Sequence, residues 1–93
     1  MTTYEAVVIF ASDEAQHQAG REFLKKELEG AGITIKKEED MGDRLLAYPV
    51  RKNDRGRYVL YVVEAASEPL KAVNKAMKLR PEILKYLFCR QEN

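Results

Sequence analysis

The sequence predicts an α+β fold, a ferredoxin-like βαββαβ sandwich in which a four-stranded antiparallel sheet carries two helices on one face. Runs rich in β-branched and aromatic residues alternate with helical patterns in the order strand, helix, strand, strand, helix, strand. Right-handed crossovers then place the first and third strands in the centre of the sheet and the other two at its edges. The length of 93 residues predicts a single domain over 1-93.

The first strand is expected over residues 4–10, whose two faces are both largely apolar, as a central strand requires. A helix follows, because Ser12 or Asp13 can cap its amino end and Gly32 can end it in a left-handed conformation. Its buried side is expected to comprise Ala15, Ala19, Phe23, Leu24 and Leu28.

The second strand is expected over residues 33–52, where apolar and polar side chains alternate. Gly42 interrupts this alternation and indicates a bulge. Pro49 cannot donate a ladder hydrogen bond, so the strand is expected at an edge of the sheet. Residues 53–56 are expected to form the hairpin turn, with Gly56 supplying the unusual backbone angles.

The third strand is expected over residues 57–65, which are apolar on both faces and therefore central. Ser67 is expected to cap a second helix, and residues 82–90 to form the last strand. The buried stripe of this second helix is expected to be Leu70, Val73 and Met77, with Ala76 as a further candidate.

Composition limits the possible chemistry. No stretch approaches the roughly 20 apolar residues that span a membrane. The single cysteine, Cys89, excludes an internal disulfide and fits a reducing cytoplasm; it is expected to be buried as a small apolar residue. The single histidine, His17, is expected on the surface. These two residues are too few for a zinc site, so we expect no metal.

The sequence carries none of the short catalytic or phosphate-binding motifs: it has no GxGxxG, GxxxxGK, GxSxG or HExxH pattern. Residues 38–40 are three consecutive acids, but neighbouring strand residues point to opposite faces and cannot converge on one ion. We therefore expect no catalytic residue, no cofactor and no small-molecule substrate.

Charge is unevenly distributed in a chain whose net charge is +1. Residues 13–43 have a net charge of −4, whereas residues 44–57 and residues 71–93 each have +4. Basic side chains on a protruding hairpin are well placed to contact phosphates, while the same charges could instead protect an edge strand from aggregation. The candidate RNA-binding residues are Arg44, Arg51, Lys52, Arg55 and Arg57.

The uncovered face of the sheet is the second candidate surface. If Tyr61 and Val63 pack on the helices, the alternating positions point to the other side. Exposed aliphatic side chains of this kind are typical of a protein interface. The candidate partner-binding residues are Val7, Ile9, Leu60 and Val62.

These residues resemble a known family. Tyr4-Glu5 opens the first strand, Arg-Leu-Leu-Ala-Tyr-Pro-Val stands at residues 44–50 before Arg51-Lys52, and Gly-Arg-Tyr stands at residues 56–58. This pattern is similar to that of the bacterial small-subunit ribosomal protein six family, in the same element order over about residues 3 to 91.

The resemblance implies a non-catalytic constituent of the small ribosomal subunit in the cytoplasm. It implies binding to the central domain of 16S ribosomal RNA together with small-subunit ribosomal protein eighteen, after the two proteins have formed a heterodimer. Among the basic residues, Arg44 and Lys52 match the family pattern.

Two other classes share this topology. An RNA recognition motif would stack bases on aromatic side chains of the open face, where this sequence is expected to present aliphatic ones; exposure of Tyr4, Phe10 and Tyr58 on that face would favour it. A ferredoxin-like ligand-binding or regulatory module would require titratable groups that converge in a pocket.

Overall fold

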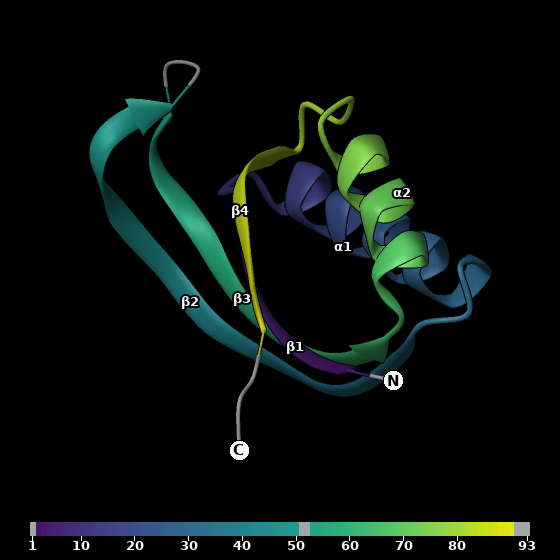
Figure 1. The fold of residues 1–93 in the computed structure, drawn as a ribbon. Coiled ribbons are helices and arrows are strands. Elements are labelled where there is room, and N and C mark those ends of the chain that lie inside the picture. The colour runs from purple at the N-terminus through teal and green to yellow at the C-terminus, as the bar shows by residue number, and fades with distance from the viewer. Residues whose placement is uncertain (1, 51–52, 91–93) are drawn as a thin grey trace.

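Two helices and four strands follow one another in the predicted order in a computed structural model, which describes residues 2–50 and 53–90. The strands pair antiparallel in the order β2-β3-β1-β4, and both helices cover the same face of the sheet (Figure 1). The ferredoxin-like prediction is therefore confirmed. The elements are β1 (Thr2–Ala11), α1 (Glu14–Gly30), β2 (Thr34–Val50), β3 (Asn53–Ala65), α2 (Ser67–Met77) and β4 (Ile83–Arg90).

The predicted alternation of side chains in the two central strands is also confirmed. Val8 of β1 and Tyr61 of β3 are at most 1% exposed and face the helices. Val7 pairs with Leu60 across the same two strands, and both are partly exposed on the uncovered side. The period of two residues in a strand thus separates a core face from an open face.

The core lies between the sheet and the helices, and large side chains from every element except β2 fill it. Apolar burial of this kind is the main favourable term in folding. The largest fully buried side chains are those of Tyr61, Phe10, Leu24, Leu28, Met77, Val8, Val59, Val63 and Val73.

Helix α1 begins and ends as the sequence predicts. The Asp13 side chain accepts a hydrogen bond from the Gln16 amide at 3.1 Å, and Gly32 adopts a φ of 77° after the last turn. The Ile33 amide then donates to the Leu28 carbonyl at 2.9 Å, which completes a Schellman-type end. Gly20 is required for close packing, because a Cβ there would come within 2.7 Å of the Phe10 ring.

Strand β2 pairs only with β3 and is an edge strand, as Pro49 predicts. Its register shifts between Asp40 and Gly42, where Gly42 has a φ of 92°. This is the predicted bulge, and bulges increase local twist and bending. The β2–β3 hairpin extends beyond the rest of the sheet and curves away from its plane (Figure 1).

The prediction for the hairpin turn is wrong. Residues 53–56 do not form the turn, because β3 already begins at Asn53 and Asn53 pairs with Val50. Gly56 does not have a positive φ; it is a buried strand residue that lies against Ile9. A glycine near a chain reversal therefore serves close packing rather than turn geometry.

The prediction for the start of α2 also needs correction. Ala66, not Ser67, is the N-cap residue, and no side chain caps the helix there. The helix depends instead on its buried stripe, which matches the predicted residues Leu70, Val73 and Met77.

The predicted burial was wrong for both the chain's only histidine and its only cysteine. His17 is 5% exposed, because the buried stripe of α1 contains His17 and Gly20 beside the correctly predicted Leu24 and Leu28, while Ala15 and Ala19 are exposed. Cys89 is exposed, because it pairs with Glu5 on the open face of edge strand β4. Neither helix in the described part of the chain has the length and apolarity to cross a membrane.

Candidate nucleic-acid interface

The basic residues of the hairpin do not form one cluster. Arg55 and Arg57 alternate with Gly56 and Tyr58 along β3, so they lie on the side of the sheet that carries the helices. Arg44 lies on the other side, with its guanidinium carbon 5.8 Å from the centre of the Tyr58 ring. Arg51 and Lys52 lie outside the described residues. The hairpin therefore presents positive charge on two opposite faces.

Arg57 is neutralised by an acid on the neighbouring strand. Its Nε donates to Asp40 Oδ1 at 3.0 Å and its Nη2 donates to Asp40 Oδ2 at 2.7 Å, a two-pronged ion pair. The hydrogen bonds from Arg57 hold the pKa of Asp40 below its usual value, so the pair stays charged near neutral pH. Only a third of the Arg57 side chain is exposed.

Arg55 is neutralised in a similar but looser way. Its Nε lies 3.3 Å from Asp43 Oδ2, and Asp43 also accepts a hydrogen bond from Ser12 Oγ at 2.8 Å. The hydrogen bond from Ser12, followed by that from Arg55, lowers the pKa of Asp43. Half of the Arg55 side chain remains exposed. Arg55 can therefore exchange Asp43 for a phosphate more easily than Arg57 can exchange Asp40.

Arg44 has no acidic partner among the described residues. Its Nε lies 3.4 Å from the Met41 carbonyl oxygen, a long hydrogen bond that leaves most of its donors available. The stacked position over Tyr58 adds a cation–π contact that orients the guanidinium. Of the three described candidates, Arg44 is therefore the one with the greatest capacity to bind an external phosphate.

A polar network that sequence analysis missed joins α1 to the hairpin. Arg21 of α1 forms ion pairs with Glu38 and, at 3.5 Å, with Asp40. The His17 Nε2 lies 3.5 Å from Arg21 Nη1, while its Nδ1 is buried without a hydrogen-bond partner in the described part of the chain. Burial first, and then the neighbouring arginines Arg21 and Arg57, lower the pKa of His17, so the ring is neutral near pH 7.

The four candidate partner-binding residues do lie together on the open face. Val7 and Leu60 pair across β1 and β3, and Ile9 and Val62 flank them along the same two strands. Leu87 of β4 lies opposite Val7 and extends this apolar surface with a side chain that is 62% exposed. Sequence analysis missed Leu87, although the alternation along β4 would have placed it there.

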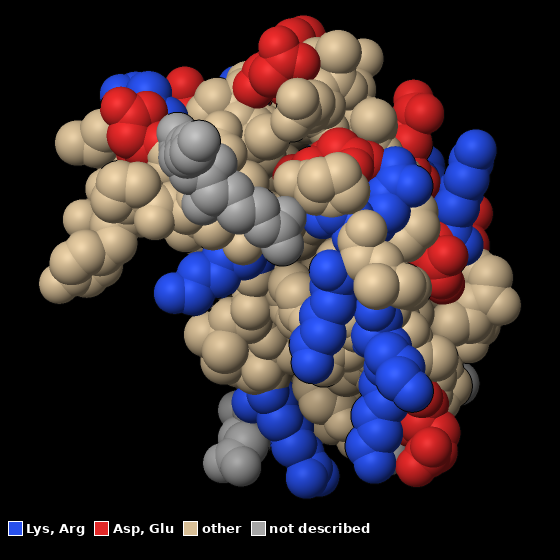
Figure 2. Space-filling view, turned by 90° about the horizontal axis from the view of Figure 1, so that it is seen from above, with Lys and Arg blue, Asp and Glu red and all other residues tan. Residues whose placement is uncertain are grey.

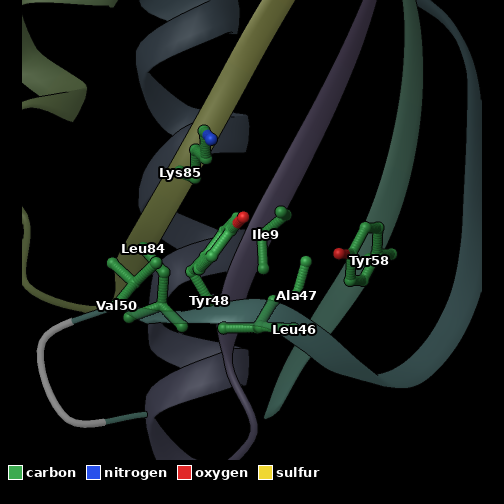
Figure 3. A pocket seen from close by; sticks show the side chains of 8 residues that line it. All are labelled: Ile9, Leu46, Ala47, Tyr48, Val50, Tyr58, Leu84 and Lys85. Atoms are coloured by element: carbon green, nitrogen blue, oxygen red, sulfur yellow. The ribbon is translucent and has the colours of Figure 1, made fainter. Parts of the chain in front are cut away.

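Beside this surface, the end of β2 borders a shallow apolar hollow of about 170 Å³ (Figure 3). The last residues of β2 approach the ends of β1 and β4, and the Tyr48 side chain remains 83% exposed. Lys85 places a charged group at its rim. The hollow is lined by Ile9, Leu46, Ala47, Tyr48, Val50, Tyr58, Leu84 and Lys85.

The aromatic side chains do not form a base-stacking platform. Phe10 is fully buried on the helix face, and Tyr4 packs against the core from the same side. Only Tyr58 of the three lies on the open face, beneath Arg44. The two described central strands thus lack the set of exposed rings on which RNA recognition motifs stack bases.

The described carboxyls with lowered pKa values do not converge in a pocket, as a ligand-binding module would require. The carboxyls with lowered pKa values, Asp40 and Asp43, are held in ion pairs at the surface. Within residues 2–50 and 53–90, no three side chains of histidine, cysteine, aspartate or glutamate could together hold a metal ion. The fold and its surfaces define a small ferredoxin-like α+β domain whose candidate sites are an exposed hairpin and an open sheet face.

Comparison with known proteins identifies the family. The model of the family described as ribosomal protein S6 matches residues 3–90. The chain belongs to the ribosomal protein S6 family, whose members are proteins of the bacterial small ribosomal subunit.

Individual relatives agree with this assignment. The small ribosomal subunit protein bS6 of Treponema denticola is 39% identical over 93 residues, which is the full length of both chains. That of Borrelia duttonii is 36% identical over 85 residues, 91% of this chain and 63% of the longer relative. The crystal structure of ribosomal protein S6 from Thermotoga maritima has a TM-score of 0.87 and 27% identity, and the alignment covers 97% of this chain and 87% of that one.

The fold alone would not have separated this family from others. The carboxy-terminal domain of the MgtC protein from Mycobacterium tuberculosis also superimposes, with a TM-score of 0.68, 13% identity and coverage of 100% of this chain and 90% of that one. This likeness shows the shared fold only, because one topology hosts many functions.

Proposed function

We propose that this chain is a non-enzymatic constituent of the small ribosomal subunit that binds the central domain of 16S ribosomal RNA together with small-subunit ribosomal protein eighteen. The membership of the family, with the basic side chains on an exposed hairpin, carries this proposal. The protein acts on the ribosome in the bacterial cytoplasm. No cofactor, metal or small-molecule substrate takes part.

The hairpin supplies the RNA contacts in this proposal. The phosphates are contacted by Arg44, Arg51, Lys52, Arg55 and Arg57. Of the three that the structure describes, Arg44 contributes the most to RNA binding, because it lacks an acidic partner among the described residues. Phosphate contacts position a protein on RNA without reading its sequence. Few charges are available, so affinity for RNA alone is modest and depends strongly on salt.

The open face supplies the protein contact. Val7, Ile9, Leu60 and Val62 are aliphatic, partly exposed and adjacent, and Leu87 enlarges their surface. Such a surface gains free energy when a partner removes it from water. Because the apolar face and the basic hairpin belong to one continuous sheet, the partner docked on the face can meet the same RNA that the hairpin contacts.

The test is salt-dependent binding to a central-domain fragment of 16S ribosomal RNA, with and without purified protein eighteen. We expect tight binding only when protein eighteen is present. The variant R44Q/R51Q/K52Q/R55Q should fold normally and bind the RNA more weakly. Its matched control, K25Q/K26Q/K36Q/K37Q, removes the same number of charges from α1 and the start of β2.

Each result has a clear meaning. Equal affinity of the hairpin variant and the unaltered chain would contradict the hairpin assignment while leaving the rest of the proposal standing. Absence of RNA binding by the unaltered chain, both alone and with protein eighteen, would contradict the proposed function itself.

A further inference from the structure

The end of the molecule that carries the α2–β4 connection has a second basic surface, within residues 71–93, whose net charge is +4. Viewed from that end, lysine and arginine side chains gather over one half of the molecule, with few acids among them (Figure 2). Residues 69–90 contain six basic residues and a single acid, Glu82. The segment is about as basic as the hairpin segment 44–57, but there Asp43 and Asp40 already pair with Arg55 and Arg57.

The only acid of this segment does not offset the surrounding lysines. Glu82 is 9% exposed and forms an ion pair with Arg80, whose guanidinium carbon lies 4.4 Å from the centre of the Phe23 ring. Among the described residues, Lys71 is the only other base of this segment in an ion pair, at 3.6 Å from Glu68. Lys75, Lys78 and Lys85 are exposed and form no ion pair within the described part of the chain. We call these three lysines the basic ridge.

The elements that carry the basic ridge are fixed relative to one another. The Tyr86 hydroxyl of β4 donates to the Asn74 carbonyl oxygen of α2 at 3.2 Å, which ties the strand to the helix one residue before Lys75. Lys85 also lines the hollow beside the end of β2. The basic ridge thus spans edge strand β4, with Lys75 and Lys78 on the side of the helices and Lys85 on the open side of the sheet.

We infer that the basic ridge is a second phosphate-binding surface, which contacts a segment of RNA backbone other than the one at the hairpin. This inference rests on the proposed RNA-binding function and names a further site for it. The physical reason is the contrast in pairing: Arg55 and Arg57 of the hairpin already have carboxylate partners, whereas the lysines of the basic ridge have none. Unpaired lysines gain more from a phosphate, because no existing ion pair must be broken.

The inference is tested with the double variant K75Q/K78Q and its matched control K25Q/K26Q, each of which removes two exposed lysines without ion pairs in the described residues. Both are assayed with protein eighteen on the central-domain RNA fragment across a range of salt concentrations. For K75Q/K78Q, the slope of log affinity against log salt should fall by about 1.4 to 1.8, and the affinity roughly tenfold. The control should leave the slope close to that of the unaltered chain.

The failure of this inference can be distinguished from failure of the proposed function. If K75Q/K78Q and K25Q/K26Q have the same slope while the unaltered chain binds RNA, the basic ridge is not a phosphate site and the proposed function stands. If K75Q/K78Q instead weakens the heterodimer in the absence of RNA, the lysines serve an acidic protein surface and the inference is overturned. If the unaltered chain does not bind RNA, both are overturned.

Discussion

Gly56 of β3 lies directly against Ile9 of β1. A Cβ at position 56 would come within 2.4 Å of Ile9 Cγ2, well inside van der Waals contact. The backbone of β3 can therefore approach β1 at the base of the hairpin only because residue 56 has no side chain. This contact fixes where the two-stranded hairpin leaves the four-stranded sheet.

Replacing Gly56 with alanine should destabilise the protein by about 1–3 kcal/mol, since the added methyl group must displace a branched side chain or the backbone. Chemical denaturation of G56A measures the loss. The double variant I9A/G56A should lose less than the sum of the two single variants, because I9A removes the clashing methyl group. Strict additivity of the two losses would show that the contact with Ile9 is not what excludes a side chain at position 56.

The pairing of Arg57 with Asp40 predicts a gain rather than a loss of function. D40N should bind RNA more tightly than the unaltered chain and with a steeper salt dependence, because it frees a guanidinium on the hairpin. D54N raises the net charge equally but frees no described ion pair, so it measures the effect of charge alone. If the two variants gain the same affinity, Arg57 does not reach the RNA.

His17 predicts a pH dependence of stability. Its pKa is lowered in the fold, principally by burial, so the unfolded chain binds more protons as pH falls through 6.5 and the free energy of unfolding decreases. For one group the slope cannot exceed about 1.4 kcal/mol per pH unit. Asp40 and Asp43, whose pKa values are lowered in the fold, contribute stability that is lost only at lower pH, as the pH falls below their unfolded-state value of 3.8.

Denaturation of H17Q across this range isolates the effect. His17 is the only histidine, so the variant should be less stable near pH 7 but should lose the slope just below pH 6.5. A slope that persists unchanged in H17Q would assign the effect to other groups.

The exposed position of Leu87 predicts that the partner-binding surface extends onto β4. L87Q should weaken the heterodimer with protein eighteen by roughly tenfold and leave stability nearly unchanged, because its exposed side chain contributes to binding only when a partner covers it. The control is L79Q, which alters a leucine that is 82% exposed in the connection between α2 and β4. Equal heterodimer affinities for these two variants would confine the interface to β1 and β3.

The fold was predictable because local patterns and tertiary structure agree in most elements. Alternation assigned Val7 and Leu60 to one face and Tyr61 to the other, and Pro49 placed β2 at an edge. The two main errors have different physical causes. His17 has a polar ring that hid its place on the buried stripe of α1, and Gly56 serves a contact with a residue 47 positions away, which local sequence does not show.

The candidate site was less predictable than the fold. Sequence charge grouped Arg44 with Arg55 and Arg57, but the strand alternation puts them on opposite faces and Asp40 and Asp43 neutralise two of them. The pairing of charges depends on register and on the bulge at Gly42, which composition does not encode. For the basic ridge, the sequence showed the net charge of +4 over residues 71–93, but only the folded structure shows which described bases lack an ion pair.

The pairing of β1 with β4 has a consequence for how the chain is made. Tyr4 lies opposite Arg90 and Phe10 opposite Ile83. The edge of β1 that pairs with β4 therefore stays uncovered until the last strand has been synthesised. Until then, a nascent chain exposes unpaired amides beside the apolar residues of a central strand, the features that promote aggregation. Premature termination before residue 83 should therefore yield a product that associates with itself or is degraded, rather than a shortened but soluble domain.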